Sequence, residues 1–486
     1  MSYLLFFIVL LGAIYTLYRL AEKSILSFKT ILLGFGIKLI FATSFILVFT
    51  HYYGDNHLNG DAYSFMNDSR VLNEFAQENT WDYLKLMVGV NPSHEEHVNG
   101  HLNNTNIWAY GDNGDLMNDN RLLIRINSLV HFYSNNNPYI HAFTMSLLAF
   151  IGLLLIHRSF SPFIKNPKLF YWTLLLFPSI AFWSSGITKE SLMIFAIGIY
   201  CFYLFKIFKT FSWTHLAGLL LGIFLLVLNK PHIGLILISF SFLFILGALS
   251  NWSKKWIYIT PILAIALITI STYTPNKINL LHKISYKQQD LINFGEGGYF
   301  FITDSSFCAF DYKFNQNFKL HEGKKIEVLK PTVGKYKLFG VSKFNLFTMP
   351  SGDQLFDLYL VVTPSSSYIK TNPINYQRIN LVKSLPDVAL NTVFRPFPWD
   401  NGSSIKFLAL VNNVLFLLII LIAFFYLRPL NNQELYIFTY LIAAALLILL
   451  IIGWTTPILG AIVRYKMAAE LLIIIAVFIR LKPIKK

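Results

Sequence analysis

The sequence has little charge and almost no cysteine. Only 13% of its 486 residues are Asp, Glu, Lys or Arg, whereas 55% are hydrophobic and 16% are aromatic. Soluble domains carry about 25% charged residues, so this composition excludes an ordinary soluble protein. The two cysteines, Cys201 and Cys308, are too few for a disulfide framework and do not indicate a redox compartment. We therefore predict an integral membrane protein.

Other signals are also missing. The first apolar stretch has no basic segment before it and no small-residue cleavage site, which predicts a retained helix rather than a signal peptide. No internal repeat of the kind found in many secondary transporters is visible. The formal charge of +15 is spread over short loops instead of forming one block, so nucleic acid is not an expected partner.

Long hydrophobic runs are abundant instead. Stretches of about 17 to 25 apolar residues recur, and each is long enough to cross a hydrocarbon core of about 30 Å. We predict about eleven transmembrane helices, at residues 3–19, 30–50, 138–156, 169–187, 190–208, 213–229, 232–250, 256–274, 405–427, 434–453 and 457–480. The expected fold is an all-α polytopic membrane protein.

Basic residues fall in alternate loops between these spans. One set of loops holds Arg19, Lys23, Lys29, Arg158, Lys165, Lys168, Lys206, Lys209, Lys254, Lys255, Arg428, Arg480, Lys482, Lys485 and Lys486. The other short loops hold only Lys189 and Lys230. Because Lys and Arg stay on the cytoplasmic side during insertion, we expect the N-terminus outside and the C-terminus in the cytoplasm.

Two long polar segments then lie on the extracytoplasmic face. The predicted order is transmembrane helices in 1–50, an outer loop with surface helices in 51–137, transmembrane helices in 138–274, an outer segment in 275–404, and transmembrane helices in 405–486. Within the second outer segment, residues 297–371 alternate apolar and polar side chains between Gly and Pro. This period of two predicts a small antiparallel β module.

Charged residues at two helix starts on the outer face are the first candidate site residues. Lys189 and Glu190 begin the fifth span, and Lys230 and His232 lie at the start of the seventh. Two helix N-termini side by side would bind an anion, since backbone N–H groups and helix dipoles favour negative charge there.

Ordinary capping is the alternative explanation for these charges. Thr188 and Asn229 would then cap the two helices, and Glu190 would offset the positive helix end. A further candidate is Asp61 in GDAYSFMND, because a carboxylate near the outer surface can act as a general base or bind a metal. An Asn/Asp/Gly-rich turn would explain the same segment.

The last span carries charge inside an apolar run. Each of Arg464, Lys466 and Glu470 would cost about 2.5 to 3.5 kcal/mol at the bilayer centre, so we expect them to face a bundle interior or a wet cavity. Lys466 and Glu470 share one helix face at i, i+4. In RPFPWD, Arg395 and Asp400 either belong to an interfacial anchor or extend the same outer cavity.

These motifs resemble the pattern of a known family. In chain order, GDAYSF, FPSIAFWSSGITKE, NKPHIG, RPFPWD and VRYKMAAE are similar to bacterial polysaccharide polymerases of the Wzy/EpsG type, and more broadly to polytopic GT-C glycosyltransferases. The resemblance spans most of the membrane part and does not cover 297–371. It implies a multi-pass enzyme of the bacterial inner membrane that moves a glycan from a polyprenyl-diphosphate donor to an acceptor at the extracytoplasmic face, in surface polysaccharide synthesis.

The resemblance also implies roles for the candidate residues. Asp61 is the first candidate for the catalytic base and Glu190 the second. The leaving diphosphate needs positive charge, which would come from Lys189, Lys230, His232, Arg395, Arg464 and Lys466. The implied partners are the lipid-linked glycan and membrane lipid; no cofactor is implied, and a divalent metal is left open.

Two functions from other classes fit the same residues. A transporter or flippase would carry a lipid-linked glycan or another anion through the cationic cavity without bond chemistry. A non-catalytic assembly subunit would use the β module to bind a partner or a glycan outside the membrane. A path that continues to the cytoplasm would favour transport over transfer.

Overall fold

The computed structural model describes residues 2–90, 100–108, 118–275, 279–303, 306–322, 325–338 and 343–483. The predicted basic residues Lys485 and Lys486 lie outside this described part. The chain forms two compact units. Unit 1 comprises residues 1–252, 421–441 and 471–486, and unit 2 comprises residues 253–420 and 442–470.

Long apolar helices dominate the fold. Within the described ranges, seven helical segments are long and apolar enough to cross a membrane. They are α1 (Ser2–Glu22), α2 (Phe28–Leu47) continued by η1 (Val48–Tyr52), α7 (Pro138–Phe160) continued by η3 (Ser161–Phe163), α10 (Lys189–Lys209), α12 (Pro231–Phe240) with α13 (Phe242–Leu249), α18 (Lys406–Phe425) and α19 (Asn432–Thr455). This architecture agrees with a multi-pass helical membrane protein.

The other four predicted spans are helical but shorter or broken. They correspond to α8 (Pro167–Leu176) with α9 (Pro178–Trp183), α11 (Trp213–Asn229), α14 (Lys255–Ser271), and α20 (Leu459–Tyr465) with α21 (Met467–Arg480). Pro178 explains one break, because proline has no N–H to donate and disfavours a helical residue before it. The apolar pattern therefore predicted helix at every one of these positions, but it did not reveal where the helices are interrupted.

A buried lysine binds the polar groups at the end of α9, just before the turn that leads into α10. Lys38, inside α2, is fully buried, and its Nζ atom lies 3.1 Å from the Ala181 carbonyl oxygen and 2.6 Å from Ser184 Oγ. The last carbonyls of a helix have no partner within that helix. Since an unsatisfied carbonyl is costly in an apolar environment, Lys38 stabilises the end of α9 where it precedes the Thr188–Lys189 turn.

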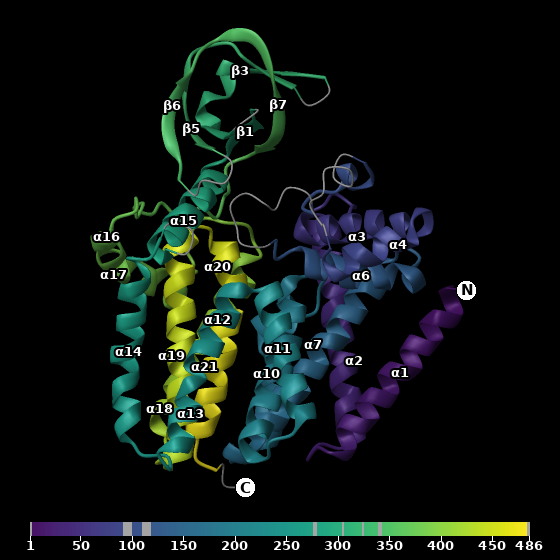
Figure 1. Cartoon of the computed structure of the whole chain (residues 1–486), viewed down its shortest axis with the longest axis vertical. Helices are drawn as coiled ribbons and strands as arrows, with labels where there is room; N and C mark the ends of the chain where they lie inside the picture. The colour runs from purple at the N-terminus through teal and green to yellow at the C-terminus, as the bar shows by residue number, and fades with distance from the viewer. Residues whose placement is uncertain are drawn as a thin grey trace. The chain divides into compact units, whose positions relative to one another are not determined.

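Within unit 1, α2, α7, α10 and α11 run side by side (Figure 1). Two glycines set the distance between α7 and α10. A Cβ atom on Gly152 would lie 2.4 Å from the Ile194 carbonyl oxygen, and one on Gly198 would lie 2.4 Å from the Gly152 carbonyl oxygen. Small residues let helix backbones approach closely, which is a common packing mode for helices in membranes.

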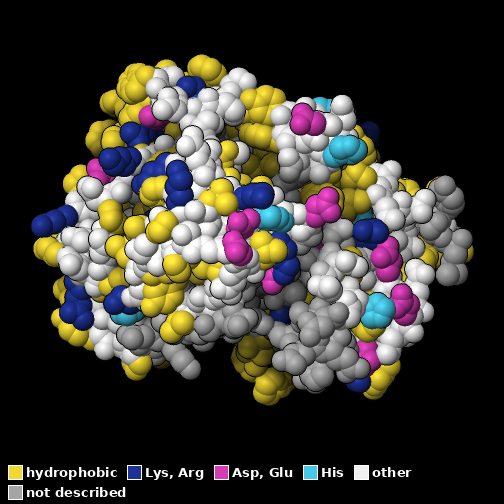
Figure 2. Space-filling view, turned by 90° about the horizontal axis from the view of Figure 1, so that it is seen from above, with side chains coloured by type: hydrophobic (Ala, Val, Ile, Leu, Met, Phe, Trp, Pro, Cys, Tyr) yellow, Lys and Arg dark blue, Asp and Glu magenta, His cyan; other side chains and the backbone are white. Residues whose placement is uncertain are grey.

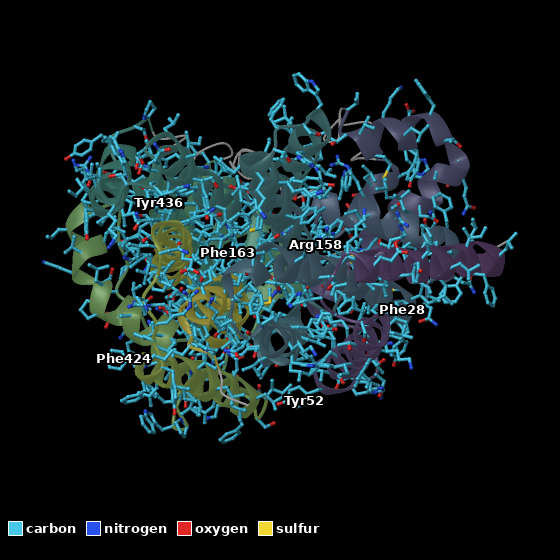
Figure 3. All side chains as sticks on the ribbon, turned by 90° about the horizontal axis from the view of Figure 1, so that it is seen from below. Phe28, Tyr52, Arg158, Phe163, Phe424 and Tyr436 are labelled. Carbon is cyan, nitrogen blue, oxygen red and sulfur yellow. The ribbon has the colours of Figure 1, made fainter. Side chains whose placement is uncertain are left out.

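Basic loops that were predicted to share one side of the membrane meet at one end of unit 1, seen from below in Figure 3. The Arg158 guanidinium and the Lys206 ammonium lie 5.0 and 4.7 Å from the centre of the Phe202 ring. Arg428 donates a hydrogen bond of 3.0 Å to the Phe163 carbonyl. Three loops of the basic set are thus neighbours, as the predicted alternation requires.

The predicted antiparallel β module is confirmed. Its strands are β1 (Gly298–Ile302), β2 (Ser306–Asp311), β3 (Phe318–His321), β4 (Lys325–Val328), β5 (Thr332–Leu338), β6 (Asn345–Met349) and β7 (Gly352–Val362), with η4 (Tyr312–Asn317) between β2 and β3. They form one strongly curved sheet in the order β3-β4-β7-β1-β2-β5-β6, and all neighbours pair antiparallel (Figure 1).

Alternation along the strands gives this sheet two apolar faces. On one face the rings of Phe301 and Phe310 stack with centroids 5.0 Å apart, and Phe318 packs on the same cluster. On the other face Phe300 stacks on Phe294 of helix α15 (Leu280–Glu296), with centroids 5.1 Å apart. The first face therefore forms the core of the module, and α15 covers part of the second face.

Shorter helices occur in both predicted outer segments. The first contains α3 (Gly60–Glu78), α4 (Thr80–Val88), η2 (His101–Asn104) and α6 (Arg121–Ser134). The second continues after the sheet with α16 (Arg378–Lys383), α17 (Leu385–Ala389) and η5 (Leu390–Phe394). The predicted surface helices of 51–137 coincide with parts of α3 and α4.

Candidate functional site

The charged residues at the starts of α10 and α12 lie together in unit 1. Lys189 Nζ lies 2.5 Å from Asp119 Oδ1, and Lys230 Nζ lies 3.2 Å from Glu190 Oε1. Asn229 Nδ2 donates a 2.8 Å hydrogen bond to the Lys189 carbonyl, which joins the two helix starts. The two N-termini are thus side by side, as the anion-site hypothesis requires.

Two exposed side chains border these ion pairs. The charge of Asp61, in the first turn of α3, acts on Lys189, and the charge of His232, in the first turn of α12, acts on Asp119. We call the six residues the Lys189 centre: Asp61, Asp119, Lys189, Glu190, Lys230 and His232. It runs from exposed Asp61 and His232 to Glu190, whose side chain is only 1% exposed.

Asp119 is the residue of this centre that the sequence did not reveal. Burial raises the pKa of its carboxyl group, but the charges of Lys189, Lys230 and His232 together lower that pKa below its ordinary value. Asp119 is therefore ionised at neutral pH. It lies in an Asn/Asp/Gly-rich segment without any period, so nothing in the local pattern distinguished it from a turn residue.

The capping alternative explains only part of this arrangement. Thr188 is the residue before α10, but its hydroxyl donates to the Trp183 carbonyl at 2.9 Å and makes no cap hydrogen bond. Asn229 is the last residue of α11, and Lys230 is the one that precedes α12, so the prediction that Asn229 caps α12 was wrong. Pro231 does occupy the first turn of α12.

A buried carboxylate holds the chain on the way to Asp119. Asp68 of α3 is fully buried, and its two oxygens accept hydrogen bonds from the backbone N–H groups of Asn106, Ile107 and Trp108 at 2.6, 2.8 and 2.9 Å. Burial raises the pKa of Asp68, and the three donors oppose that shift. Arg121 Nη2 then donates to the Trp108 carbonyl at 3.1 Å. The residues held in this way, 106–108, come before Asp119 in the chain.

A second polar group, in unit 2, surrounds the predicted residue Lys466. Its Nζ atom lies 2.8 Å from Asn413 Oδ1 and 3.6 Å from Glu470 Oε1, and Asn412 Nδ2 donates to the same Glu470 oxygen at 3.1 Å. Lys466 and Glu470 are each 1% exposed. The prediction that they point into a protein interior is therefore confirmed, but Lys466 lies in the break between α20 and α21, so the two residues do not share one continuous helix.

The same geometry does not support Lys466 as a diphosphate ligand. Besides Asn413 and Glu470, its ammonium donates to the Thr392 carbonyl at 3.3 Å and to the Arg395 carbonyl at 3.5 Å. An ammonium has three donors, so protein oxygens already use its capacity. Lys466 instead joins η5, α18 and the break between α20 and α21.

Arg395 and Arg464 are also in unit 2. Arg395 Nε lies 3.6 Å from Asp400 Oδ1. The other carboxylate oxygen of Asp400, Oδ2, accepts a 2.7 Å hydrogen bond from the Phe397 N–H. Trp399 is 78% exposed and stacks with Phe397 at 5.0 Å, as expected for an aromatic anchor. Arg464 is half-buried, with its guanidinium 6.0 Å from the Tyr465 ring.

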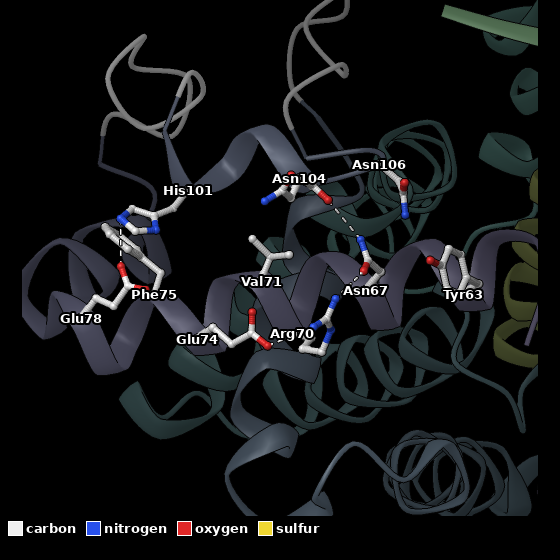
Figure 4. Close-up of a pocket in the computed structure, with 10 residues that line it drawn as sticks. All are labelled: Tyr63, Asn67, Arg70, Val71, Glu74, Phe75, Glu78, His101, Asn104 and Asn106. Atoms are coloured by element: carbon white, nitrogen blue, oxygen red, sulfur yellow. Dashed lines mark hydrogen bonds and ion pairs between the residues drawn. The ribbon is translucent and has the colours of Figure 1, made fainter. Parts of the chain in front are cut away.

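A cavity of about 440 Å³ lies along α3 in unit 1 (Figure 4). We call it the α3 groove, and its lining residues are Tyr63, Asn67, Arg70, Val71, Glu74, Phe75, Glu78, His101, Asn104 and Asn106. Tyr63 and Asn106 lie at one end, and His101, Phe75 and Glu78 lie at the other (Figure 4).

The described residues contain no group of three or more His, Cys, Asp or Glu side chains that could hold a metal ion. Acidic, basic and histidine side chains all reach the surface on the face seen from above (Figure 2). Comparison with known proteins adds no relative: no family model matches the chain, no curated protein matches its sequence, and no solved structure matches its fold.

Proposed function

We propose that this protein is a membrane glycosyltransferase of the polymerase type. It moves a glycan from a polyprenyl-diphosphate donor to an acceptor at the extracytoplasmic face of the bacterial inner membrane, in surface polysaccharide synthesis. The proposal includes eleven transmembrane helices with the N-terminus outside. The observation that carries it is the Lys189 centre, where cations and carboxylates meet at two helix N-termini.

The cations of this centre suit a diphosphate. Lys189 and Lys230 are 12% and 11% exposed, so their ammonium groups are reachable but poorly hydrated. Positive charge in such a site stabilises a developing anion more strongly than it does in water. His232 and the N-termini of α10 and α12 add further positive potential. Lys189 would share its charge between Asp119 and the leaving group.

Asp61 is the proposed base. It is exposed and near enough for its charge to act on Lys189. The acceptor hydroxyl would give its proton to the Asp61 carboxylate while its oxygen forms a bond to the anomeric carbon of the donor sugar. The bond between that carbon and the diphosphate oxygen breaks, and its electron pair leaves on the diphosphate beside Lys189.

Glu190 has a different role in this proposal. Its side chain is 1% exposed and paired with Lys230, so it positions that lysine and does not reach an acceptor hydroxyl. Asp119 likewise orients Lys189. No step is assigned to Arg395, Arg464 or Lys466.

The test compares Lys189→Ala and Asp61→Asn with Lys209→Ala, which removes the same charge from the exposed other end of α10. Surface polysaccharide is separated by gel, and membrane levels of each variant are measured. We expect both centre variants to lose long chains by about a hundredfold or more and the control to keep them. Normal chain length in both, at wild-type membrane levels, would sink the proposal.

A second measurement separates transfer from transport. Periodate that cannot cross the membrane oxidises lipid-linked units only if they face outwards. We expect single units to accumulate in periodate-sensitive form in the Lys189→Ala strain. Units that accumulate in protected form would identify a flippase instead.

A further inference from the structure

The α3 groove is built along one helix face. Its lining residues on α3 run from Tyr63 to Glu78 at spacings of three and four, so they form a single stripe. Fifteen steps of 1.5 Å from Tyr63 to Glu78 make this stripe about 22 Å long. The opposite wall comes from His101, Asn104 and Asn106 (Figure 4). The groove is therefore long and narrow, a shape that suits an extended ligand.

Its wall is fixed before any ligand binds. The three hydrogen bonds from residues 106–108 to buried Asp68 hold this segment against α3. Asn67 Nδ2 donates to the Asn104 carbonyl at 3.2 Å, across the groove. A preformed wall lowers the conformational cost of binding.

The groove has no excess of positive charge. Arg70 lies 3.0 Å from Glu74 Oε1, and His101 Nε2 lies 3.0 Å from Glu78 Oε2. Each basic side chain of the groove is thus matched by a carboxylate, and these side chains are 45 to 57% exposed, whereas the paired lysines of the Lys189 centre are only 11 and 12% exposed. This charge balance disfavours a phosphate or diphosphate as the ligand.

The remaining lining groups match sugar hydroxyls. Asn104 and Asn106 have exposed amides, and each amide carries both donors and an acceptor, as a hydroxyl group does. Tyr63 is 50% exposed, so its ring presents a flat apolar face and its hydroxyl a polar edge at one end of the groove. The lining is mostly polar, with Val71 and Phe75 as its apolar members, and this suits a ligand rich in hydroxyl groups better than an apolar one.

The groove leads towards the Lys189 centre. Tyr63 lines one end of it, and Asp61 is two residues earlier in the first turn of α3, about 3 Å along the helix axis but on a different face of the helix. We infer that the α3 groove binds a neutral oligosaccharide, the acceptor glycan, whose end then lies at the first turn of α3, the turn that carries Asp61. The acceptor role rests on the proposed function, whereas oligosaccharide binding does not.

The binding test uses the purified full chain in detergent. The probe is the set of oligosaccharides released by mild acid from the surface polysaccharide of the producing cells, labelled at the reducing end. Tyr63→Ala and Asn106→Ala are compared with Gln77→Ala, an exposed α3 residue that does not line the groove. We expect the two groove variants to raise Kd about tenfold or more and the control to leave it unchanged.

Competition and chain length complete the test. Inorganic pyrophosphate should not displace the oligosaccharide, and the groove variants should make shorter chains in cells. Equal Kd in all variants, or displacement by pyrophosphate, overturns the inference. If Lys189→Ala loses polymer while the groove variants bind normally, only the groove inference fails. If Lys189→Ala keeps polymer while the groove variants lose binding, only the proposed function fails.

Discussion

Lys230 and Glu190 form a nearly buried ion pair between the residue that precedes α12 and the first turn of α10. Their charged atoms lie 3.2 Å apart, and the side chains are 11% and 1% exposed. Removing one partner of such a pair leaves a buried charge without compensation, which typically costs about 3 to 5 kcal/mol. The pair therefore ties α10 to α12 and holds Lys230 in place.

We expect Glu190→Gln and Lys230→Met each to lower the thermal unfolding temperature of the purified protein. The double variant should lose less than the sum of the two, since it leaves no lone charge. Lys209→Met, at the exposed end of α10, should have little effect. Strictly additive losses would show that the two side chains do not interact.

The contact between α7 and α10 gives a second prediction. Gly152→Ala and Gly198→Ala each place a Cβ atom 2.4 Å from a backbone oxygen of the other helix. Overpacking of this kind typically costs about 1 to 3 kcal/mol. Gly36→Ala on α2, where a Cβ meets nothing within 4 Å, is the matched control. Unfolding in detergent measures the difference, and equal stability of all three variants would contradict the close packing.

Lys466 should behave as a structural residue. Lys466→Met removes the positive charge that pairs with Glu470 and the donor that bonds Asn413 Oδ1. We therefore expect a marked loss of thermal stability. Lys189→Ala, by contrast, should lose polymer with a smaller loss of stability, because the partner it leaves behind, Asp119, is 34% exposed and can be hydrated, whereas Glu470 is 1% exposed. A Lys466→Met protein of normal stability that makes no polymer would restore this lysine to the ligand-binding residues.

His131 predicts a dependence of stability on pH. Burial lowers the pKa of this α6 imidazole, which bonds Ser69 Oγ at 3.0 Å and is also influenced by Arg70 and Glu74. The unfolded chain, with an ordinary pKa of about 6.5, then binds a proton more readily than the folded protein does. Protonation of His131 therefore does not reduce the free energy of unfolding above about pH 6.5, and it reduces this free energy increasingly as the pH falls below that value.

Lowering the pH from 8 to 5.5 should lower the unfolding temperature of the wild type. We expect a smaller drop over the same pH range in His131→Gln. The exposed His57→Gln variant serves as the control. Identical pH profiles for His131→Gln and the wild type would show that His131 does not contribute to this dependence.

Sequence periodicity predicted the parts of the fold that depend on local burial. Apolar stretches gave the helix positions, and alternation gave the sheet between β1 and β7. The break at Phe177 has a local cause in Pro178, but no proline marks the breaks at Ser241 and Lys466, whose side chains bond to Tyr200 and Asn413 elsewhere in the chain. The order of the strands could not be predicted either, because β7 pairs with β1 and β4, which are distant from it in the sequence.

The candidate site, like the fold, was predicted only where the local sequence pattern marks a residue. Charges that interrupt apolar runs, such as Lys189 and Lys230, stand out in the sequence. Their partner Asp119 is 70 residues from Lys189 and lies among many other polar residues. Lys466 stood out equally, but its neighbours Asn412 and Asn413 decide its role, and an amide in an apolar run gives little signal by itself.

Lys38 also constrains the order in which the protein can be assembled. Its partners Ala181 and Ser184 follow it by 143 and 146 residues, so they are synthesised long after α2 enters the membrane. At about 5 to 20 residues per second, the ammonium waits roughly 7 to 30 s for them. A lone lysine at mid-membrane costs about 2.5 to 3.5 kcal/mol on insertion scales. In a bilayer, helix α2 would carry this cost until α9 arrives, so we expect the pairing of Lys38 with the end of α9 to be a late step of biogenesis.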